Sequence, residues 1–281
     1  MMNLNTLTFI GCDHTYKDAD IVLFGAPFDG TTSYRPGTRF APQVIRLDSD
    51  GLETYSPYLD KDLLDKKIAD IGDLTMTFGN KHKSLKTIKE TAQTIISANK
   101  KPLMIGGEHL VTLPVVEALY EKYPDLQLIQ FDAHTDLRDD YLGEKLSHAT
   151  VVRRVHDLLG DDKIHQFGMR SGTKEEFDFA KKHTFLERFT VDTIKDRLTH
   201  LKDIPLYVTI DLDILDPSIM SGTGTPEPGG ITFKELLVAL KQLEGLNIVG
   251  CDIVELAPDY DASGVSTAVA SKVIREMLLL L

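Results

Sequence analysis

Short, nearly continuous apolar runs alternate with longer amphipathic stretches along most of this 281-residue chain. An apolar run without polar alternation is typical of a strand buried on both faces of a parallel sheet, and the amphipathic stretches are typical of the helices that cover it. The pattern therefore predicts an α/β fold around a mostly parallel, eight-stranded sheet. Because no linker or low-complexity segment interrupts the pattern, residues 1–281 are expected to form a single domain.

The expected elements follow from these runs. Strands are expected at residues 21–26, 67–72, 102–107, 126–134, 163–168, 184–186, 205–213 and 247–256. Helices are expected at 83–99, 112–123, 148–159, 174–182, 192–201, 233–244 and 265–281. The pattern alone does not separate a closed barrel from an open sheet, but both place an active site at the carboxyl ends of the strands.

Acidic residues and histidines gather where the expected strands end. Because alternate residues of a strand point the same way, residues two apart are expected to share a face where the chain stays extended. Carboxylates crowded at the edge of an apolar sheet would repel one another unless cations neutralise them. The residues in question are His109, Asp132, His134, Asp136, Asp211, Asp213 and Glu255.

The donor types narrow the choice of cation. Four carboxylates with two imidazoles and no thiolate do not suit structural zinc, and two imidazoles are unusual for magnesium or calcium. Mixed oxygen and nitrogen donors suit manganese or a similar divalent ion. Six donors exceed what one catalytic ion with an open position needs, so two ions that share bridging carboxylates are expected.

The chain resembles the ureohydrolase family, which includes arginases and agmatinases, in motifs that follow the same order. These motifs are FGAPFDGTTSYRPGTRFAPQVIR, GGEH, QFDAHTDLRDDYLGEKLSHAT, FGMRSG, TIDLDILDPSIMSGTGTPEPGG and DIVELAPDYD. The resemblance implies an open three-layer α/β/α fold and two Mn²⁺ ions per chain. It implies that His109 and Asp136 hold one ion, that His134 and Asp213 hold the other, and that Asp132 and Asp211 bridge them. It also implies a homo-oligomer, a trimer or a hexamer.

The expected reaction is hydrolysis of a guanidinium group to release urea, by a hydroxide that bridges the two metal ions. His148, in the motif LSHAT, is expected to transfer a proton to the departing amine. Glu255 is expected to orient the guanidinium, because a carboxylate matches its planar, two-donor edge. The Gly- and Pro-rich segment 221–230 is expected to form a loop over the site, with Thr225 near the substrate; Glu227 has no expected role.

The substrate is expected to be a small cationic guanidino compound, with agmatine preferred. The segments GTTSYRPGTRFAPQVIR and PEPGG resemble those of agmatinases, which implies conversion of agmatine to putrescine and urea in polyamine biosynthesis. Asp139, Asp140 and Glu144 would repel an α-carboxylate and favour a bare ammonium, unless they belong to a solvated loop. Guanidinobutyrate, arginine and formiminoglutamate stay open as substrates, because related enzymes change substrate through loop residues.

Charge and composition exclude other partners. The net charge of −12 and pI of about 5.2 leave no basic footprint for nucleic acid or an anionic membrane. Cys12 and Cys251 form no disulfide framework, and the first residues lack the pattern of a signal peptide. No apolar run reaches the roughly 18 residues that a membrane span needs. A cytoplasmic protein is expected.

Two other classes of function stay open. A non-catalytic binding protein on the same fold would not need His148 and Glu255, which are both present. A zinc-dependent deacetylase on a related fold would hold one ion, which would leave the second aspartate pair and His109 without a role. The number of metal ions bound per chain separates the deacetylase from the ureohydrolase.

Overall fold

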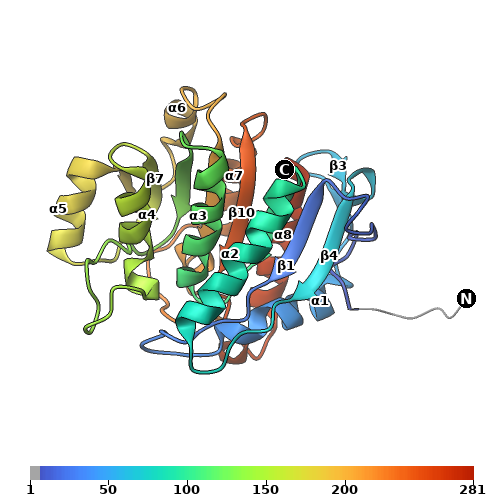
Figure 1. Cartoon of the computed structure of the whole chain (residues 1–281), viewed down its shortest axis with the longest axis horizontal. Coiled ribbons are helices and arrows are strands. Elements are labelled where there is room, and N and C mark those ends of the chain that lie inside the picture. Colours follow the sequence, from blue (N-terminus) through green and yellow to red (C-terminus); the bar gives the residue numbers. More distant parts are fainter. Residues whose placement is uncertain (1–6) are drawn as a thin grey trace, which may run out of the picture.

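The computed structural model describes residues 7–281, which are built around one eight-stranded parallel sheet (Figure 1). Its strand order is β4-β1-β5-β10-β9-β6-β7-β8. The strands are β1 (Ile21–Gly25), β4 (Ile68–Asp73), β5 (Lys101–Ile105), β6 (Gln127–Phe131), β7 (Ile164–Met169), β8 (Phe185–Arg188), β9 (Leu206–Asp211) and β10 (Ile248–Val254). All eight expected strands are present, and every pairing between them is parallel.

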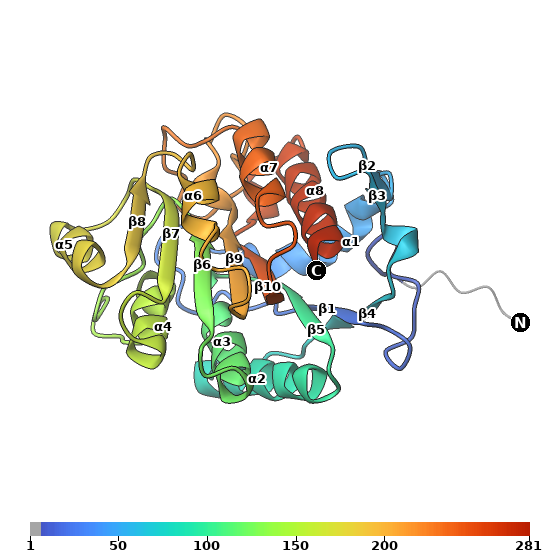
Figure 2. The same ribbon diagram turned by 90° about the horizontal axis from the view of Figure 1, so that it is seen from above.

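Helices cover both faces of the sheet, so the fold is the expected three-layer α/β/α sandwich (Figure 2). On one face lie α2 (Lys81–Ser97), α3 (Thr112–Lys122) and α4 (Val151–Leu159). On the other lie α1 (Ala41–Ser49), α6 (Ile194–Leu198), α7 (Phe233–Lys241) and α8 (Val265–Leu280). Helix α5 (Lys174–His183) lies beside β8 at the edge of the sheet.

Two elements were not expected from the sequence. Helix α1 begins at Ala41 with Pro42 in its first turn, and its buried face includes Ile45. A two-stranded antiparallel pair, β2 (Tyr55–Ser56) and β3 (Lys61–Asp62), follows it. Helix α6 is also shorter than the expected 192–201.

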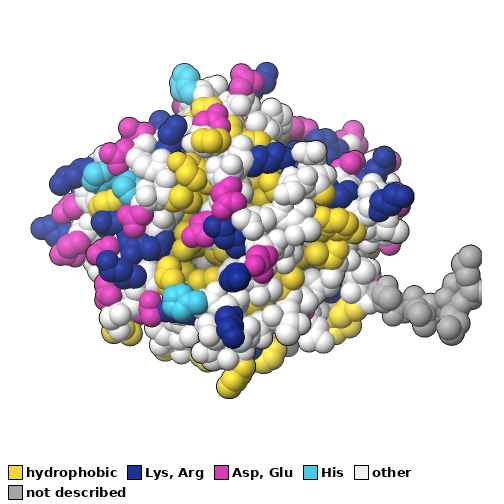
Figure 3. All heavy atoms as spheres, viewed as in Figure 1, with side chains coloured by type: hydrophobic (Ala, Val, Ile, Leu, Met, Phe, Trp, Pro, Cys, Tyr) yellow, Lys and Arg dark blue, Asp and Glu magenta, His cyan; other side chains and the backbone are white. Residues whose placement is uncertain are grey.

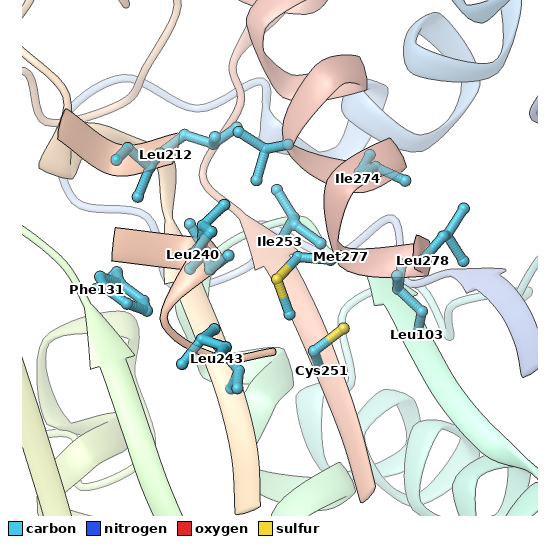
Figure 4. Close-up of a cluster of buried hydrophobic side chains, with 14 of the residues drawn as sticks. Leu103, Phe131, Leu212, Leu240, Leu243, Cys251, Ile253, Ile274, Met277 and Leu278 are labelled. Carbon is cyan, nitrogen blue, oxygen red and sulfur yellow. The ribbon is translucent and has the colours of Figure 1, made fainter. Parts of the chain in front are cut away.

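The hydrophobic core has two parts, one on each side of the sheet, because successive side chains of each strand point to opposite faces. Figure 4 shows the side of α7 and α8, where Cys251 and Ile253 of β10 face Leu240, Leu243 and Met277. The alternate residues of β10, Asp252 and Val254, therefore point toward the α2–α4 layer. Cys251 is fully buried, as expected for a core residue.

Charged side chains of both signs lie on the surface of the protein (Figure 3). On the face drawn in Figure 3, acidic and basic side chains are interspersed and form no basic stripe. Within residues 7–281, no helix has the length and apolar character that crossing a membrane requires.

Candidate metal centre and substrate pocket

The six acids and histidines expected to bind metal come together at the carboxyl ends of β5, β6 and β9. The ligand atoms of His109, Asp132 and Asp211 lie within 4.8 Å of one another, and so do those of Asp132, His134 and Asp213. Asp132 is shared by both groups. Asp136 joins the first group, since its Oδ2 lies 3.1 Å from Nδ1 of His109. All four aspartates and His109 are buried.

The backbone brings these groups together by turning, which differs from the extended arrangement expected from the sequence. Strand β6 ends at Phe131, and the Asp132 carboxylate then accepts a bond from the backbone N–H of His134 at 2.6 Å. In the same way Asp211 ends β9 and accepts from the N–H of Asp213 at 2.9 Å. A carboxylate that bonds two residues ahead forms an Asx turn. The prediction of continued strands through 134 and 213 was therefore wrong.

Two residues of the site adopt a left-handed backbone that non-glycine residues rarely take. Asp136 has φ +52° and Glu255 has φ +67°. Such positions cost free energy and persist where the surrounding structure imposes them. Here the turn after β6 and the turn after β10 direct two carboxylates toward the same cluster.

His109 has the orientation of a metal ligand. Its Nδ1 is buried and has no hydrogen-bond partner among the described residues, although carboxylate oxygens of Asp132 and Asp136 both lie 3.1 Å away. Its Nε2 lies 2.9 Å from the hydroxyl oxygen of Thr209. A neutral imidazole with its proton on Nε2 presents the Nδ1 lone pair to the acids, where a cation would satisfy both.

The cluster carries more negative charge than a buried site can hold without cations. Burial and the charge of Asp132 raise the pKa of Asp136 to about 7. Burial and the charge of Asp213 raise the pKa of Asp211 well above its usual range. Either protons or metal ions must supply the missing positive charge. The donor set, the free Nδ1 of His109 and this crowding all fit two divalent cations.

A cavity of about 280 Å³ opens onto the cluster and holds both residues expected to act on the substrate. Glu255 lines it, and its Oε1 accepts a bond from the backbone N–H of His109 at 2.7 Å. His148 lines its wall and is held by Thr31, whose hydroxyl oxygen accepts from the His148 backbone N–H at 3.1 Å. Burial lowers the pKa of His148 to about 4, so its imidazole is neutral at pH 7.

Sequence reasoning gave no role to Glu108, which fixes the loop beside His148. Its fully buried carboxylate accepts bonds from the backbone N–H and the hydroxyl of Thr31, at 2.8 and 2.5 Å. Its backbone N–H donates to the carbonyl of Phe28 at 2.8 Å. The loop then places the Ser33 hydroxyl 3.3 Å from Nε2 of His148. The motif GGEH pointed to this segment, but only its histidine was assigned.

The segment 221–230 is irregular, as expected, and reaches the cluster through Thr225. The Thr225 hydroxyl donates to Oδ2 of Asp213 at 3.3 Å, and Thr225 lines the cavity. Arg170 ties this loop to the turn after β9, because its guanidinium donates to the carbonyl oxygens of Glu227 and Asp213 at 2.7 and 2.6 Å. Glu227 thus contributes its backbone carbonyl.

Comparison with known proteins decides the family. The model of the arginase family matches residues 19–280. The chain belongs to the arginase family. It is 50% identical to an agmatinase of Bacillus subtilis over 275 residues, which cover 96% of this chain and 95% of that protein. A solved Clostridium difficile structure, described as a candidate agmatinase, has a TM-score of 0.93 and 52% identity, covering 95% of this chain and 98% of that one. A guanidinobutyrase of Pseudomonas aeruginosa is 33% identical over 275 residues, 93% of this chain and 86% of that protein.

This arginase-family chain is therefore a hydrolytic enzyme, and the predicted ureohydrolase resemblance and arginase-like fold are confirmed. The relatives do not support the alternatives of a deacetylase or a non-catalytic binding protein. The roles predicted for the six acids and histidines, for His148 and for Glu255 stay predictions, although the structure brings all eight residues together.

The loop acids that were expected to select an ammonium group do not line the cavity. Asp139 pairs with Arg154 at 2.7 Å, and Glu144 forms an ion pair with Lys81. Asp140 accepts a bond from the backbone N–H of Gly143 at 2.8 Å. All three carboxylates therefore have partners within the loop or on the helices beside it. Of the two alternatives, contact with the substrate or a place in a solvated loop, these contacts favour the solvated loop.

A basic residue, Arg138, lines the cavity instead. Its Nε lies 3.4 Å from the buried carboxylate of Glu176, and its guanidinium stacks 4.9 Å from the ring centre of Tyr141. Glu176 also accepts bonds from the hydroxyl of Thr135 and the backbone N–H of Leu137. The charge of Arg138 is therefore partly balanced where the cavity meets solvent.

A third group of possible metal ligands, His156, Asp161 and His183, lies on the surface away from the cavity. Nitrogens of both imidazoles lie 2.8 Å from the same oxygen of Asp161. The rings pack against Phe179, with centroids 4.8 and 4.3 Å away. Hydrogen bonding between two rings and one carboxylate accounts for this arrangement.

Proposed function

We propose that this enzyme hydrolyses agmatine to putrescine and urea with two Mn²⁺ ions bound per chain. The observation that carries the proposal is the convergence of His109, Asp132, His134, Asp136, Asp211 and Asp213 beneath a cavity that contains His148 and Glu255. The named agmatinases at about half identity favour agmatine over other guanidino compounds. As the resemblance implied, His109 and Asp136 would hold one ion and His134 and Asp213 would hold the other. Asp132 and Asp211 would contribute to both.

When bound, the two ions supply a water molecule activated as a nucleophile at neutral pH. The chain's own residues do the rest. His148 is neutral at pH 7, so its imidazole can accept the proton released during attack and deliver it to the departing amine. Without that proton the amine would have to leave as an unstable anion.

Glu255 holds the guanidinium by accepting bonds from its N–H edge. Burial and the neighbouring charge of Glu108 raise the pKa of Glu255 well above its usual range. A cationic guanidinium at this position opposes both effects, because its positive charge favours the ionised carboxylate. Substrate binding and ionisation of Glu255 are therefore coupled, which selects a charged guanidinium over a neutral ligand of the same shape.

One observation favours a second substrate, 4-guanidinobutyrate. Arg138 lines the cavity, and an arginine there suits a substrate that ends in a carboxylate. Its pairing with Glu176 reduces this effect, and the relative named guanidinobutyrase is the more distant one, at 33% identity. Agmatine therefore stays the first choice.

The test is urea release by the manganese-loaded enzyme from agmatine, 4-guanidinobutyrate, arginine and formiminoglutamate. We expect kcat/KM for agmatine to exceed each of the others by about tenfold or more, which corresponds to about 1.4 kcal/mol of selective stabilisation. Arg138→Gln should weaken any residual activity on 4-guanidinobutyrate and leave arginine unfavourable. A wild-type preference for 4-guanidinobutyrate would refute agmatine as the substrate, while the same metal centre would stand.

The setting of the reaction is also proposed. We expect a cytoplasmic enzyme of polyamine biosynthesis that works as a homo-oligomer, a trimer or a hexamer, with residues 1–281 as one domain. The participation of strands from both halves of the chain in one sheet supports the single domain. Size-exclusion chromatography with light scattering tests the oligomer, and a monomeric mass would refute it.

A further inference from the structure

Asp252 is a fully buried carboxylate to which the proposed reaction assigns no role. It lies on β10, three residues before Glu255, and points away from the Cys251 side of the sheet. Two hydroxyls donate to it at 2.6 Å each, from Tyr207 and from Thr209. Burial raises the pKa of Asp252, while the nearby His109 and these hydroxyls act in the opposite direction.

The sheet register places these groups in one row. Asp252 of β10 pairs directly with Thr209 of β9, and Tyr207 lies two residues earlier on the same face of β9. On the other side of Thr209 stands His109, at the start of the segment that leads into α3, with its Nε2 2.9 Å from the Thr209 oxygen. The row therefore runs from His109 through Thr209 to Asp252.

The hydrogen-bonding capacity of each group in the row determines which atom donates and which accepts. An ionised carboxylate only accepts hydrogen bonds, so the single hydroxyl proton of Thr209 is committed to Asp252. The Thr209 oxygen can then only accept from His109, which requires the imidazole proton to be on Nε2. The lone pair of His109 is thereby left on Nδ1, the nitrogen that faces Asp132 and Asp136.

We propose that Asp252 is a positioning residue that acts through Thr209 to fix the tautomer and ring orientation of His109 for metal binding. This inference rests on the proposed function, because it takes His109 as a metal ligand. Partners behind a metal-binding histidine typically contribute roughly 10- to 100-fold in metal affinity. Only the ion held by His109 and Asp136 should depend on the row, since His134 and Asp213 do not contact Thr209.

The experiment measures Mn²⁺ binding, by titrating metal-free protein and following free Mn²⁺ by electron paramagnetic resonance. Thr209→Val keeps the shape of the side chain and removes the hydroxyl. We expect it to weaken the binding of one of the two Mn²⁺ ions roughly 10- to 100-fold and to leave the affinity for the other ion unchanged. Thr209→Ser restores the hydroxyl and should recover most of the affinity, which a purely structural effect of lost packing would not allow.

Two further variants keep the test decisive. Asp252→Asn can still accept from Thr209 through its amide oxygen but lacks the charge, so it should weaken the same ion by less than Thr209→Val does. Thr267→Val, at a buried threonine of α8, is the matched control and should bind both ions as the wild type does.

Each outcome has a defined meaning. If the wild type binds two ions and both Thr209→Val and Asp252→Asn bind both equally tightly, the row is refuted and the metal centre stands. Equal weakening of both ions would also refute it, since the effect would not pass through His109. A wild type that binds no Mn²⁺ would overturn the metal centre together with the row built on it.

Discussion

Arg170 is the residue whose removal should most directly separate the 221–230 loop from the cluster. Its guanidinium donates to backbone carbonyl oxygens in two segments, beside the single β-bridge between Leu215 and Ile231. It reaches Asp213 at 2.6 Å and Ile214 at 3.0 Å in the turn after β9, and Glu227 at 2.7 Å in the loop. Arg170→Met would remove the side-chain donor to the Asp213 and Glu227 carbonyls. The Ile214 carbonyl would keep its bond from the backbone N–H of Ile231, and the Asp216 carboxylate would still accept from the N–H groups of Gly229 and Gly230.

The size of the effect follows from the number and kind of these bonds. A hydrogen bond to a charged group contributes about 1.5–3 kcal/mol, and such contributions do not add fully. Because the loop can relax and admit water to some carbonyls, we expect Arg170→Met to lower the free energy of unfolding by about 3–5 kcal/mol. At roughly 2–4 °C per kcal/mol for a chain of this size class, the melting temperature should fall by about 10 °C.

Arg170→Lys should recover less than half of this loss, because a single ammonium cannot span carbonyls in two segments. The assay is thermal and urea unfolding followed by circular dichroism, together with kcat/KM on agmatine. Arg188→Met, at an exposed arginine of β8, is the matched control and should change stability by less than about 1 kcal/mol. Should Arg170→Met prove as stable as this control, the loop would not depend on Arg170 and the reasoning would fail.

Three more predictions concern single side chains. His148→Gln should lower kcat by about 10²- to 10⁴-fold with Mn²⁺ binding unchanged, measured by urea release and metal titration, and an unchanged kcat would remove His148 from the mechanism. The buried His165 has a pKa lowered to about 3, chiefly by burial, so the folded protein keeps it neutral while the unfolded chain protonates it below about 6.5. The stability that the neutral His165 contributes is complete above that pH and is lost as the pH falls, by about 2 kcal/mol at pH 5. His165→Gln should therefore reduce the difference between the free energies of urea unfolding at pH 7 and at pH 5. An unaltered difference would contradict the assignment. Gly107→Ala would place a methyl group 1.9 Å from the carbonyl oxygen of Phe28, so it should destabilise the protein by about 1–3 kcal/mol, and an unchanged melting temperature would show that the loop can move aside.

The sheet and its site-bearing edge could be predicted from the sequence because the signals are local. Each buried strand is an apolar run, and Asp132, Asp211 and Glu255 follow such runs directly. The path of the backbone beyond the strand ends could not be predicted in this way. It depends on Asx turns at Asp132 and Asp211 and on a left-handed residue at Asp136, which alternation of side chains does not reveal.

The partners of loop charges were also beyond local reasoning. For Asp139 and Glu144 the sequence left substrate contact and a solvated loop both open. In the structure Asp139 pairs with Arg154 of α4 and Glu144 pairs with Lys81 of α2. Helix α1 was missed because it is short, and most of its buried face is formed by small or polar residues, including Ser49 and Arg46. Arg46 is held by Asp70 of β4 at 2.7 Å, a contact that exists only once the sheet has formed.

The place of β10 in the sheet has a consequence for how the protein is made. It is the last strand in sequence, yet it lies between β5 and β9, and it alone joins the β4-β1-β5 group to the β9-β6-β7-β8 group. On the ribosome, everything through β9 emerges while the two groups still lack their common neighbour. During that interval β5 and β9 present unpaired edges, which are prone to aggregation and suited to chaperone binding. His109 follows β5 in one group, whereas Asp132, His134, Asp211 and Asp213 lie at or just after the ends of β6 and β9 in the other. The proposed two-ion centre can therefore be completed only after β10 has joined the two groups.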